Sequence, residues 1–197
     1  MSARQWLLFL PQTPAVPSSL RVSVWRRMQQ LGAVALQNGV WILPRSDELE
    51  RVLQLLLEEL EKQGGGGFLL IAQATKIPPE ERIIERFRAE RKEDYDEFLE
   101  RCQQFHAELE KETKVQKFTF AELEENEEDL HKLTLWLRKI HHRDFFGGSQ
   151  RDAATDALTQ CRRALEQFTA QVYRRQGYEP PDVSSADGEA PQESGFE

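Results

Sequence analysis

The chain has 197 residues, of which 39% are hydrophobic and 30% are charged, with a formal net charge of −8. This composition is typical of a soluble protein with one large or two small domains, and no run approaches the ~18 consecutive apolar residues of a membrane helix. Residues 1–77 hold 8 basic and 6 acidic side chains, whereas the remaining 120 residues hold 18 and 28. Because nucleic-acid binding depends on neutralised phosphates, this balance argues against a general DNA clamp and leaves only local basic patches.

The first half of residues 1–77 contains a strand, a helix and a hairpin. The apolar run "QWLLFLP" (5–11) predicts a buried strand closed by proline. A proline-rich loop leads to the helix "SSLRVSVWRRMQQLG" (18–32), which Ser18 or Ser19 is expected to cap. Asn38-Gly39 lies between two apolar runs, "AVALQ" and "VWILP", and predicts a hairpin with a type I′ turn.

A second helix and a last strand complete this region. Asp47 with Glu50 predicts the helix start, and the apolar stripe of this helix is formed by Leu49, Leu53, Leu56 and Leu60. The glycine run at 64–67 lacks the GK[ST] ending of a phosphate loop and no helix follows it, so we interpret it as a flexible connector. The run "FLLIAQA" (68–74) is the last strand. The order strand, helix, hairpin, helix, strand predicts an α+β, ferredoxin-like (split βαβ) domain over residues 1–77: a four-stranded antiparallel sheet with two helices on one face.

Residues 78–176 are predicted to form a helical domain of about three helices, bundled or coiled-coil-like, and residues 177–197 a disordered acidic tail. Gly147-Gly148 breaks the chain, and Ser149 with Asp152 predicts the next helix start. The last helix has a 4-3-4-3-4 apolar seam typical of lengthwise helix packing, formed by Ala154, Leu158, Cys161, Leu165, Phe168 and Val172. Whether its partner is the same chain or a second copy is left open by the sequence.

The arginines of the helix at 18–32 do not share one exposed face. At ~100° per residue, the buried face is formed by Leu20, Val24, Met28 and Leu31. Arg21 and Arg27 flank this face and Arg26 points outward, whereas a groove-reading helix needs its contacts on one side. We therefore interpret it as a core helix whose outer edge, Trp25 especially, is a candidate contact for DNA or a protein partner.

A second cationic group lies in "RKIHHRDFF" (138–146), where Arg138, Lys139 and His142 share helical spacing and form a candidate oxyanion contact. A helix C-terminus also favours cations through its dipole, which explains the group without a ligand. Adjacent histidines on a helix point ~100° apart, so His141 and His142 do not form one metal site from the same face. The sequence predicts no metal, cofactor or catalytic site.

An enzyme is not expected. The carboxylates lie in helical charge runs such as "EENEEDL" (124–130), and neither a nucleophile elbow nor a metal-ligand spacing is found. Ferredoxin-like nucleases of CRISPR spacer acquisition place a metal-binding Asp after the first strand, where this chain has Gln12 and Thr13. The sequence also predicts a cytoplasmic protein, because the two cysteines lie far apart without CxxC spacing and because "WLLFL", preceded only by Arg4, breaks at Pro11 and is no secretory signal. Cys102 and Cys161 lie on apolar stripe positions and are expected to be buried and unpaired.

The stretch "QWLLFLPQTPAVPSSLRVSVWRRMQQLGAVALQNGVWILP" (5–44) resembles the N-terminal domain of the ChrB chromate-resistance family, and "FRAERKEDYDEFLERCQQF" (87–105) resembles the helix that follows it there. The likeness covers roughly residues 3–175 and is strongest over the first 45. The resemblance implies a bacterial protein linked to chromate response, since full-length members are chromate-sensing transcriptional regulators whose N-terminal part is credited with DNA contact. Those members carry a further C-terminal domain, which this sequence lacks, so we expect either a separate chain to supply it or another input to act on this protein.

Three hypotheses follow. The leading one is a non-enzymatic regulatory or accessory protein that self-associates through its helices and contacts operator DNA through Arg21, Arg26 and Arg27. Further candidate DNA contacts are the pairs Arg162-Arg163 and Arg174-Arg175. The second hypothesis is a scaffold that docks another chain on its helices. The third is a metal-dependent nuclease that uses Asp47 or a helix acid.

Overall fold

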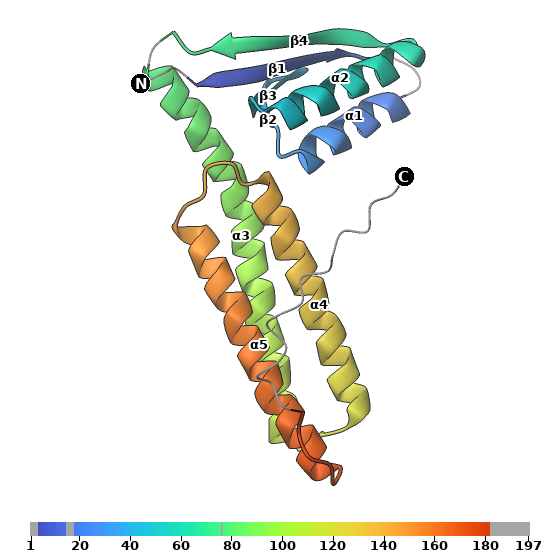
Figure 1. The fold of residues 1–197 in the computed structure, drawn as a ribbon, viewed down its shortest axis with the longest axis vertical. Coiled ribbons are helices and arrows are strands. Elements are labelled where there is room, and N and C mark those ends of the chain that lie inside the picture. The colour runs from blue at the N-terminus through green and yellow to red at the C-terminus, as the bar shows by residue number, and fades with distance from the viewer. Residues whose placement is uncertain (1–3, 15–17, 76, 182–197) are drawn as a thin grey trace. The chain divides into compact units, whose positions relative to one another are not determined.

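The computed structural model describes residues 4–14, 18–75 and 77–181, apart from the side chains of residues 77, 78 and 149. Four strands and five helices follow one another in these residues (Figure 1). In chain order they are β1 (Gln5–Gln12), α1 (Ser19–Gln30), β2 (Val34–Gln37), β3 (Val40–Pro44), α2 (Asp47–Lys62), β4 (Gly66–Gln73), α3 (Ile77–Lys114), α4 (Phe120–Arg143) and α5 (Ser149–Arg175).

The four strands form one antiparallel sheet in the order β2-β3-β1-β4. Helices α1 and α2 cover one face of it, where Met28 and Leu53 are fully buried against Leu7 and Phe9 of β1. The predicted ferredoxin-like sheet with two helices is therefore confirmed, and three further helices follow it.

The opposite face of the sheet is covered by segments from much later in the chain. Trp6 of β1 is 1% exposed, and its ring stacks on Phe87 of α3 with the centroids 5.9 Å apart. Phe145 and Phe146, from the loop between α4 and α5, complete this second core. The first turns of α3 and this loop are thereby fixed beside each other.

The chain forms two compact units, and α3, α4 and α5 each contribute to both. The sheet unit contains the chain up to Phe98 together with Trp136–Ala154; the helical unit contains Leu99–Leu135 and the chain from Thr155 onward. Residues 78–98, which the sequence assigns to a separate helical domain, thus pack within the sheet unit.

The helical unit contains most of the predicted apolar seam of α5. All six seam residues are buried, Ala154 in the sheet unit and the other five in the helical unit. Phe168 packs against Phe118 with ring centroids 5.6 Å apart, and the Cys161 Sγ–H donates to the Cys102 carbonyl at 3.7 Å. The seam is therefore covered by the same chain. Most of the predicted tail, residues 182–197, lies outside the described residues.

Two predicted helix starts need correction. Ser46, not Asp47, is the N-cap of α2, because its Oγ accepts the Leu49 N–H at 3.2 Å, while Glu50 accepts instead from Arg45 Nε at 3.0 Å. Ser18 stands at the N-cap position of α1 but makes no side-chain cap bond there. The cap expected at Ser149 lies outside the described side chains.

The second half of the glycine run, expected to be a flexible connector, is part of the sheet, whereas Gly64 and Gly65 lie between α2 and β4. Gly66 and Gly67 begin β4 and pair with Gln12 and Pro11 of β1. Gly67 has a φ of +152°, and a Cβ placed there would lie 2.5 Å from the Leu10 carbonyl oxygen. A side chain at position 67 would therefore clash with the backbone of the neighbouring strand.

The hairpin forms where it is expected, but without the predicted type I′ turn. That turn needs positive φ at both central residues, whereas Gly39 has a φ of +75° and, among the described non-glycine residues, only Gln116 has a positive φ. The pairing of β2 with β3 shifts register between Ala35 and Gln37. This irregularity accommodates the turn that Asn38 and Gly39 adopt.

Candidate functional site

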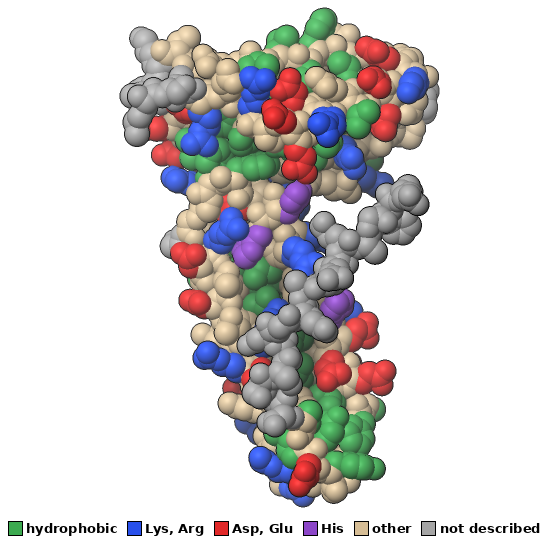
Figure 2. Space-filling model, viewed as in Figure 1, with side chains coloured by type: hydrophobic (Ala, Val, Ile, Leu, Met, Phe, Trp, Pro, Cys, Tyr) green, Lys and Arg blue, Asp and Glu red, His purple; other side chains and the backbone are tan. Residues whose placement is uncertain are grey.

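The outer edge of α1 is the first candidate surface. Val24 and Met28 are buried and Leu20 and Leu31 pack on the same core, which confirms that α1 is a core helix. The three arginines of the helix, Arg21, Arg26 and Arg27, are exposed, and the described part of the chain shows no ion pair to any of them. No acidic residue occurs in α1, although acidic side chains of α2 lie near it on this unit (Figure 2).

Arg21 and Trp25 are one helical turn apart, and both line an open hollow between α1 and the β2–β3 hairpin. Its volume is about 790 Å³, and its other walls include Gln12, Asn38 and Trp41. Trp25 remains 53% exposed. We call this the tryptophan hollow. The sequence indicated Trp25 as a contact residue but not the hollow, because the hairpin residues become neighbours of α1 only in the folded sheet.

The three residues of the predicted oxyanion contact point into solvent, whereas the arginine that follows them points inward. Arg138, Lys139 and His142 are exposed side chains on α4. Arg143, the next cation along the chain, turns toward the interior of the sheet unit and lies 3.4 Å from the Asp94 carboxylate. The folded chain thus gathers a different set of cations, which the sequence did not indicate.

That set surrounds Asp144, a buried carboxylate between α4 and α5. Its Oδ2 accepts the Tyr95 hydroxyl at 2.7 Å, and its Oδ1 accepts the backbone N–H of Gly147 at 2.9 Å and of Phe146 at 3.3 Å. Burial, with the hydrogen bond to Asp144, raises the pKa of Tyr95, so the phenol keeps its proton at neutral pH. Both oxygens of this buried carboxylate therefore have donors from the protein itself.

A hollow of about 270 Å³ opens beside Asp144, and we call it the arginine hollow. Three guanidinium groups line it: Arg88 and Arg91 from α3, and Arg151 from the first turns of α5. Arg91 is only 5% exposed, and Glu90 next to it has its pKa raised by burial. Burial and then the Arg151 charge lower the pKa of nearby His141, so this ring stays neutral and adds no cation.

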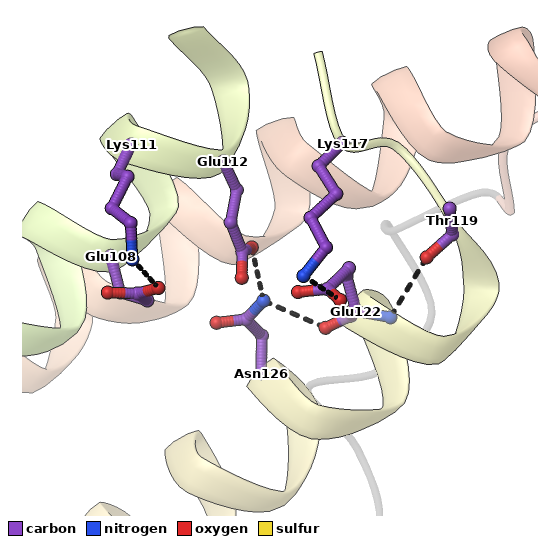
Figure 3. Close-up of polar contacts among 7 residues, drawn as sticks. All are labelled: Glu108, Lys111, Glu112, Lys117, Thr119, Glu122 and Asn126. Carbon is purple, nitrogen blue, oxygen red and sulfur yellow. Dashed lines mark hydrogen bonds and ion pairs between the residues drawn. The ribbon is translucent and has the colours of Figure 1, made fainter. Parts of the chain in front are cut away.

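A second polar cluster joins α3 to α4 in the helical unit (Figure 3). Buried Asn126 donates to Glu112 Oε2 and to the Glu122 carbonyl, each at 2.8 Å, while Lys117 forms an ion pair with Glu122. Burial, followed by the hydrogen bond with Glu122, raises the pKa of Glu112 to about 7. Thr119 Oγ1 accepts the Glu122 N–H at 3.2 Å, so this cluster caps the start of α4.

The capping signal at this junction is visible in the sequence. "TFAE" (119–122) has the Ser/Thr-x-x-Glu spacing of a capping box, although it was not among the helix starts predicted from the sequence. The cluster holds the start of α4 through the hydrogen bond between Thr119 and the Glu122 N–H. We therefore interpret it as structural.

The cysteines and the other titratable residues that the structure describes are not grouped into a metal centre. Cys102 and Cys161 are buried and free, as expected. Within residues 4–14, 18–75 and 77–181, no three His, Cys, Asp or Glu side chains are grouped so that they could hold a metal ion. None of the helices in these residues is long and apolar enough to cross a membrane.

The fold is a ferredoxin-like α+β module that continues into three long helices, and two hollows open on its sheet unit. The family model for "Protein ChrB, N-terminal" matches residues 21–179. The chain therefore belongs to the family of ChrB N-terminal regions. Protein ChrB of Cupriavidus metallidurans is 34% identical over 70 residues, which are 36% of this chain and 22% of that protein. The match thus spans about a fifth of that relative's length. No solved structure matches the chain.

Proposed function

We propose that the chain is a non-enzymatic regulatory or accessory protein of chromate resistance that contacts operator DNA in the cytoplasm. The family membership supports the link to chromate. The observation that carries the DNA contact is the outer edge of α1, where three arginines are exposed on a helix that has no acidic residue. In a chain of net charge −8, this is a local basic surface of the kind that phosphate contact requires.

The arrangement of α1 favours phosphate contacts rather than base reading. Val24 and Met28 bury one side of the helix in the core, so α1 is not free to enter a groove lengthwise. Arg21, Arg26 and Arg27 emerge in different directions from the exposed side, where each reaches a separate phosphate. Contacts of this kind position a protein on DNA, whereas sequence is read at base edges.

Fluorescence anisotropy with a labelled fragment of the chain's own promoter, at two salt concentrations, tests this proposal. We expect specific binding that the triple variant Arg21→Gln, Arg26→Gln, Arg27→Gln weakens at least tenfold. Three phosphate contacts would also reduce the slope of log K against log salt by about 2.7. The matched control removes the same charge from exposed helix positions as Lys111→Gln, Lys114→Gln, Lys132→Gln. Absence of binding at both salt concentrations, or equal weakening in the control, would contradict DNA contact through α1.

A scaffold that docks a protein partner is the second candidate, favoured by exposed apolar side chains. Trp25 lies at the rim of the tryptophan hollow, and the edge strand β4 exposes Phe68, Leu70 and Ile71 by about half. Edge strands usually carry charges or proline that block pairing, and "GGFLLIAQ" has neither. Sedimentation of the purified chain, with and without Trp25→Ala, detects self-association. Co-purification of a stoichiometric partner, with no affinity for DNA, would favour the scaffold.

The nuclease hypothesis has the weakest support. Asp47 is the first residue of α2, where an acidic side chain favours the positive end of the helix dipole. Magnesium-dependent cleavage of DNA that is lost in Asp47→Asn would restore this hypothesis.

A further inference from the structure

The buried guanidinium of Arg91 is incompletely paired. Its Nη1 lies 2.9 Å from Asp94 Oδ2, close enough for an ion pair but without hydrogen-bond alignment. Its Nε has no acceptor within the part of the chain that the structure describes. Its Nη2 lies 3.6 Å from the Glu90 carboxylate, and Asp94 is shared with Arg143. A buried donor without an acceptor is destabilising, so an acceptor that enters the arginine hollow would be stabilised there.

The side chains that line the hollow carry more positive than negative charge. Arg88, Arg91 and Arg151 line it with three positive charges, and the carboxylate of Asp144 contributes one negative charge. That carboxylate already accepts from Tyr95 and from two backbone N–H groups, and it lies 3.9 Å from Arg151. Arg88, by contrast, is exposed and forms no ion pair among the described residues. The side chains of the lining therefore carry a net charge of +2, which Asp94 and Glu90 reduce because both pair with Arg91.

The backbone adds further positive charge to that of the lining side chains. The hollow lies where the loop Gly147-Gly148 enters α5, a helix of 27 residues. The first N–H groups of a helix have no acceptor within it, and the helix dipole places a partial positive charge at this end. Phosphate and sulfate groups bind at such helix starts in many proteins. The start of α5 lies beside three arginines in this hollow. The unpaired Nε of buried Arg91, which is on α3, is an observation independent of the helix start.

We propose that the arginine hollow binds a tetrahedral oxyanion of charge −2, held by Arg88, Arg91 and Arg151 at the start of α5. Guanidinium groups suit this ligand class because their planar N–H pairs match two oxygens at once. The ligand would join α3 to the α4–α5 loop within the sheet unit. The site rests on this geometry and not on DNA contact by α1, so either proposal stands without the other.

Isothermal titration calorimetry of the full chain tests the site with sodium sulfate, sodium phosphate and sodium chromate, each at constant ionic strength set with chloride. Sulfate and chromate have the same shape and charge, but only chromate is a strong oxidant, so sulfate separates binding from thiol oxidation. A preference for phosphate points to a phosphorylated ligand, and a preference for chromate connects the site to the proposed function. We expect binding of at least one of the three anions at 1:1 stoichiometry.

Variants identify the site. Arg88→Gln removes an exposed, unpaired side chain and is expected to fold normally while raising the Kd at least tenfold. Arg151→Gln should do the same, and Arg91→Lys, which keeps the charge but loses the guanidinium geometry, should weaken binding with little effect on overall charge. Arg138→Gln is the matched control, since it removes an equal charge from the exposed α4 group. Failure of all three anions to bind, an unchanged Kd in Arg88→Gln, or equal weakening in Arg138→Gln would overturn the proposal.

Discussion

The hydroxyl of Tyr95 donates to the buried carboxylate of Asp144 across 2.7 Å and so ties the middle of α3 to the loop before α5. The two residues are 49 positions apart in the chain, and both are less than 9% exposed. This bond keeps one wall of the arginine hollow in place. It also gives Asp144 Oδ2 a hydrogen-bond donor, without which this oxygen would be buried and unsatisfied.

Removing this bond should destabilise the protein. Tyr95→Phe keeps the ring but leaves Asp144 Oδ2 without its closest donor, so we expect the free energy of unfolding to fall by about 1–3 kcal/mol. Urea unfolding followed by circular dichroism measures this difference. Tyr178→Phe is the control, because Tyr178 is 62% exposed, and it should change stability by less than about 0.5 kcal/mol. Equal effects of the two variants would contradict the assigned role of Tyr95.

The Glu112 carboxyl makes stability depend on pH near neutrality. Its pKa is raised from 4.5 to about 7 in the folded chain, chiefly by burial and by its contact with Glu122. The folded state therefore binds more protons than the unfolded state between about pH 4.5 and 7, so stability falls as the pH rises through this window. Lys117 lowers the pKa of Glu122, so its opposite contribution is lost only at more acidic pH.

Thermal melts at pH 5, 6, 7 and 8 should show this decline in the wild type and a flatter profile in Glu112→Gln. Glu108→Gln is the control, since Glu108 is an exposed carboxylate one turn earlier on the same helix that pairs with Lys111. A wild-type profile that rises across this window, or one that Glu112→Gln leaves unchanged, would show that Glu112 does not titrate near neutral pH.

Two adjacent glycines of β4 should respond differently to alanine. A Cβ at Gly67 would lie 2.5 Å from the Leu10 carbonyl oxygen at a φ of +152°, whereas a Cβ at Gly66 would meet no atom within 4 Å. We expect Gly67→Ala to cost at least the ~1–3 kcal/mol of a strained backbone position, and Gly66→Ala to be nearly neutral. Chemical unfolding of both variants measures the difference, and similar stabilities would contradict the close approach of β4 to β1 at Leu10.

The two thiols should be unreactive in the folded protein. Cys102 and Cys161 are 2% and 0% exposed, and the hydrogen bond with Cys161, together with burial, raises the pKa of Cys102. Reactivity needs both access and a thiolate, so Ellman's reagent should label neither residue within minutes under native conditions and both in guanidinium. Rapid labelling of one thiol in the native protein would show that the helical unit opens at α3 or α5.

The sheet could be predicted from the sequence because its signals are local. The Leu53 and Leu60 stripe, the Asn38-Gly39 turn and the short apolar strands each depend on a few neighbouring residues, and the structure confirms the elements that they predict. The predictions that were wrong concern local details that depend on contacts between distant parts of the chain. Gly66 and Gly67 looked like a connector because the close approach of Leu10 is absent from the local sequence.

The arginine hollow could not be predicted in the same way. Arg88 and Arg91 occur in a helix dense with charge, where each looks like a solvated side chain. Their partners at 144–151 follow some 50 residues later and meet them only when α3 packs beside the α4–α5 loop. The cations at 138–142 form a visible cluster because they are adjacent in sequence, but the helix turns them outward and the next arginine, Arg143, inward.

The late covering of Trp6 has a consequence for synthesis of the chain. Phe145 and Phe146, which pack over the second face of the sheet, follow Trp6 by 139 and 140 residues. At the ~5–20 residues per second of translation, Trp6 emerges roughly 7–28 s before they do. During that interval Phe87 and its neighbours on α3 can cover Trp6 and Ile42 only in part, so some of this apolar surface stays open on the nascent chain. Folding of the sheet unit thus finishes only when most of the protein has been made.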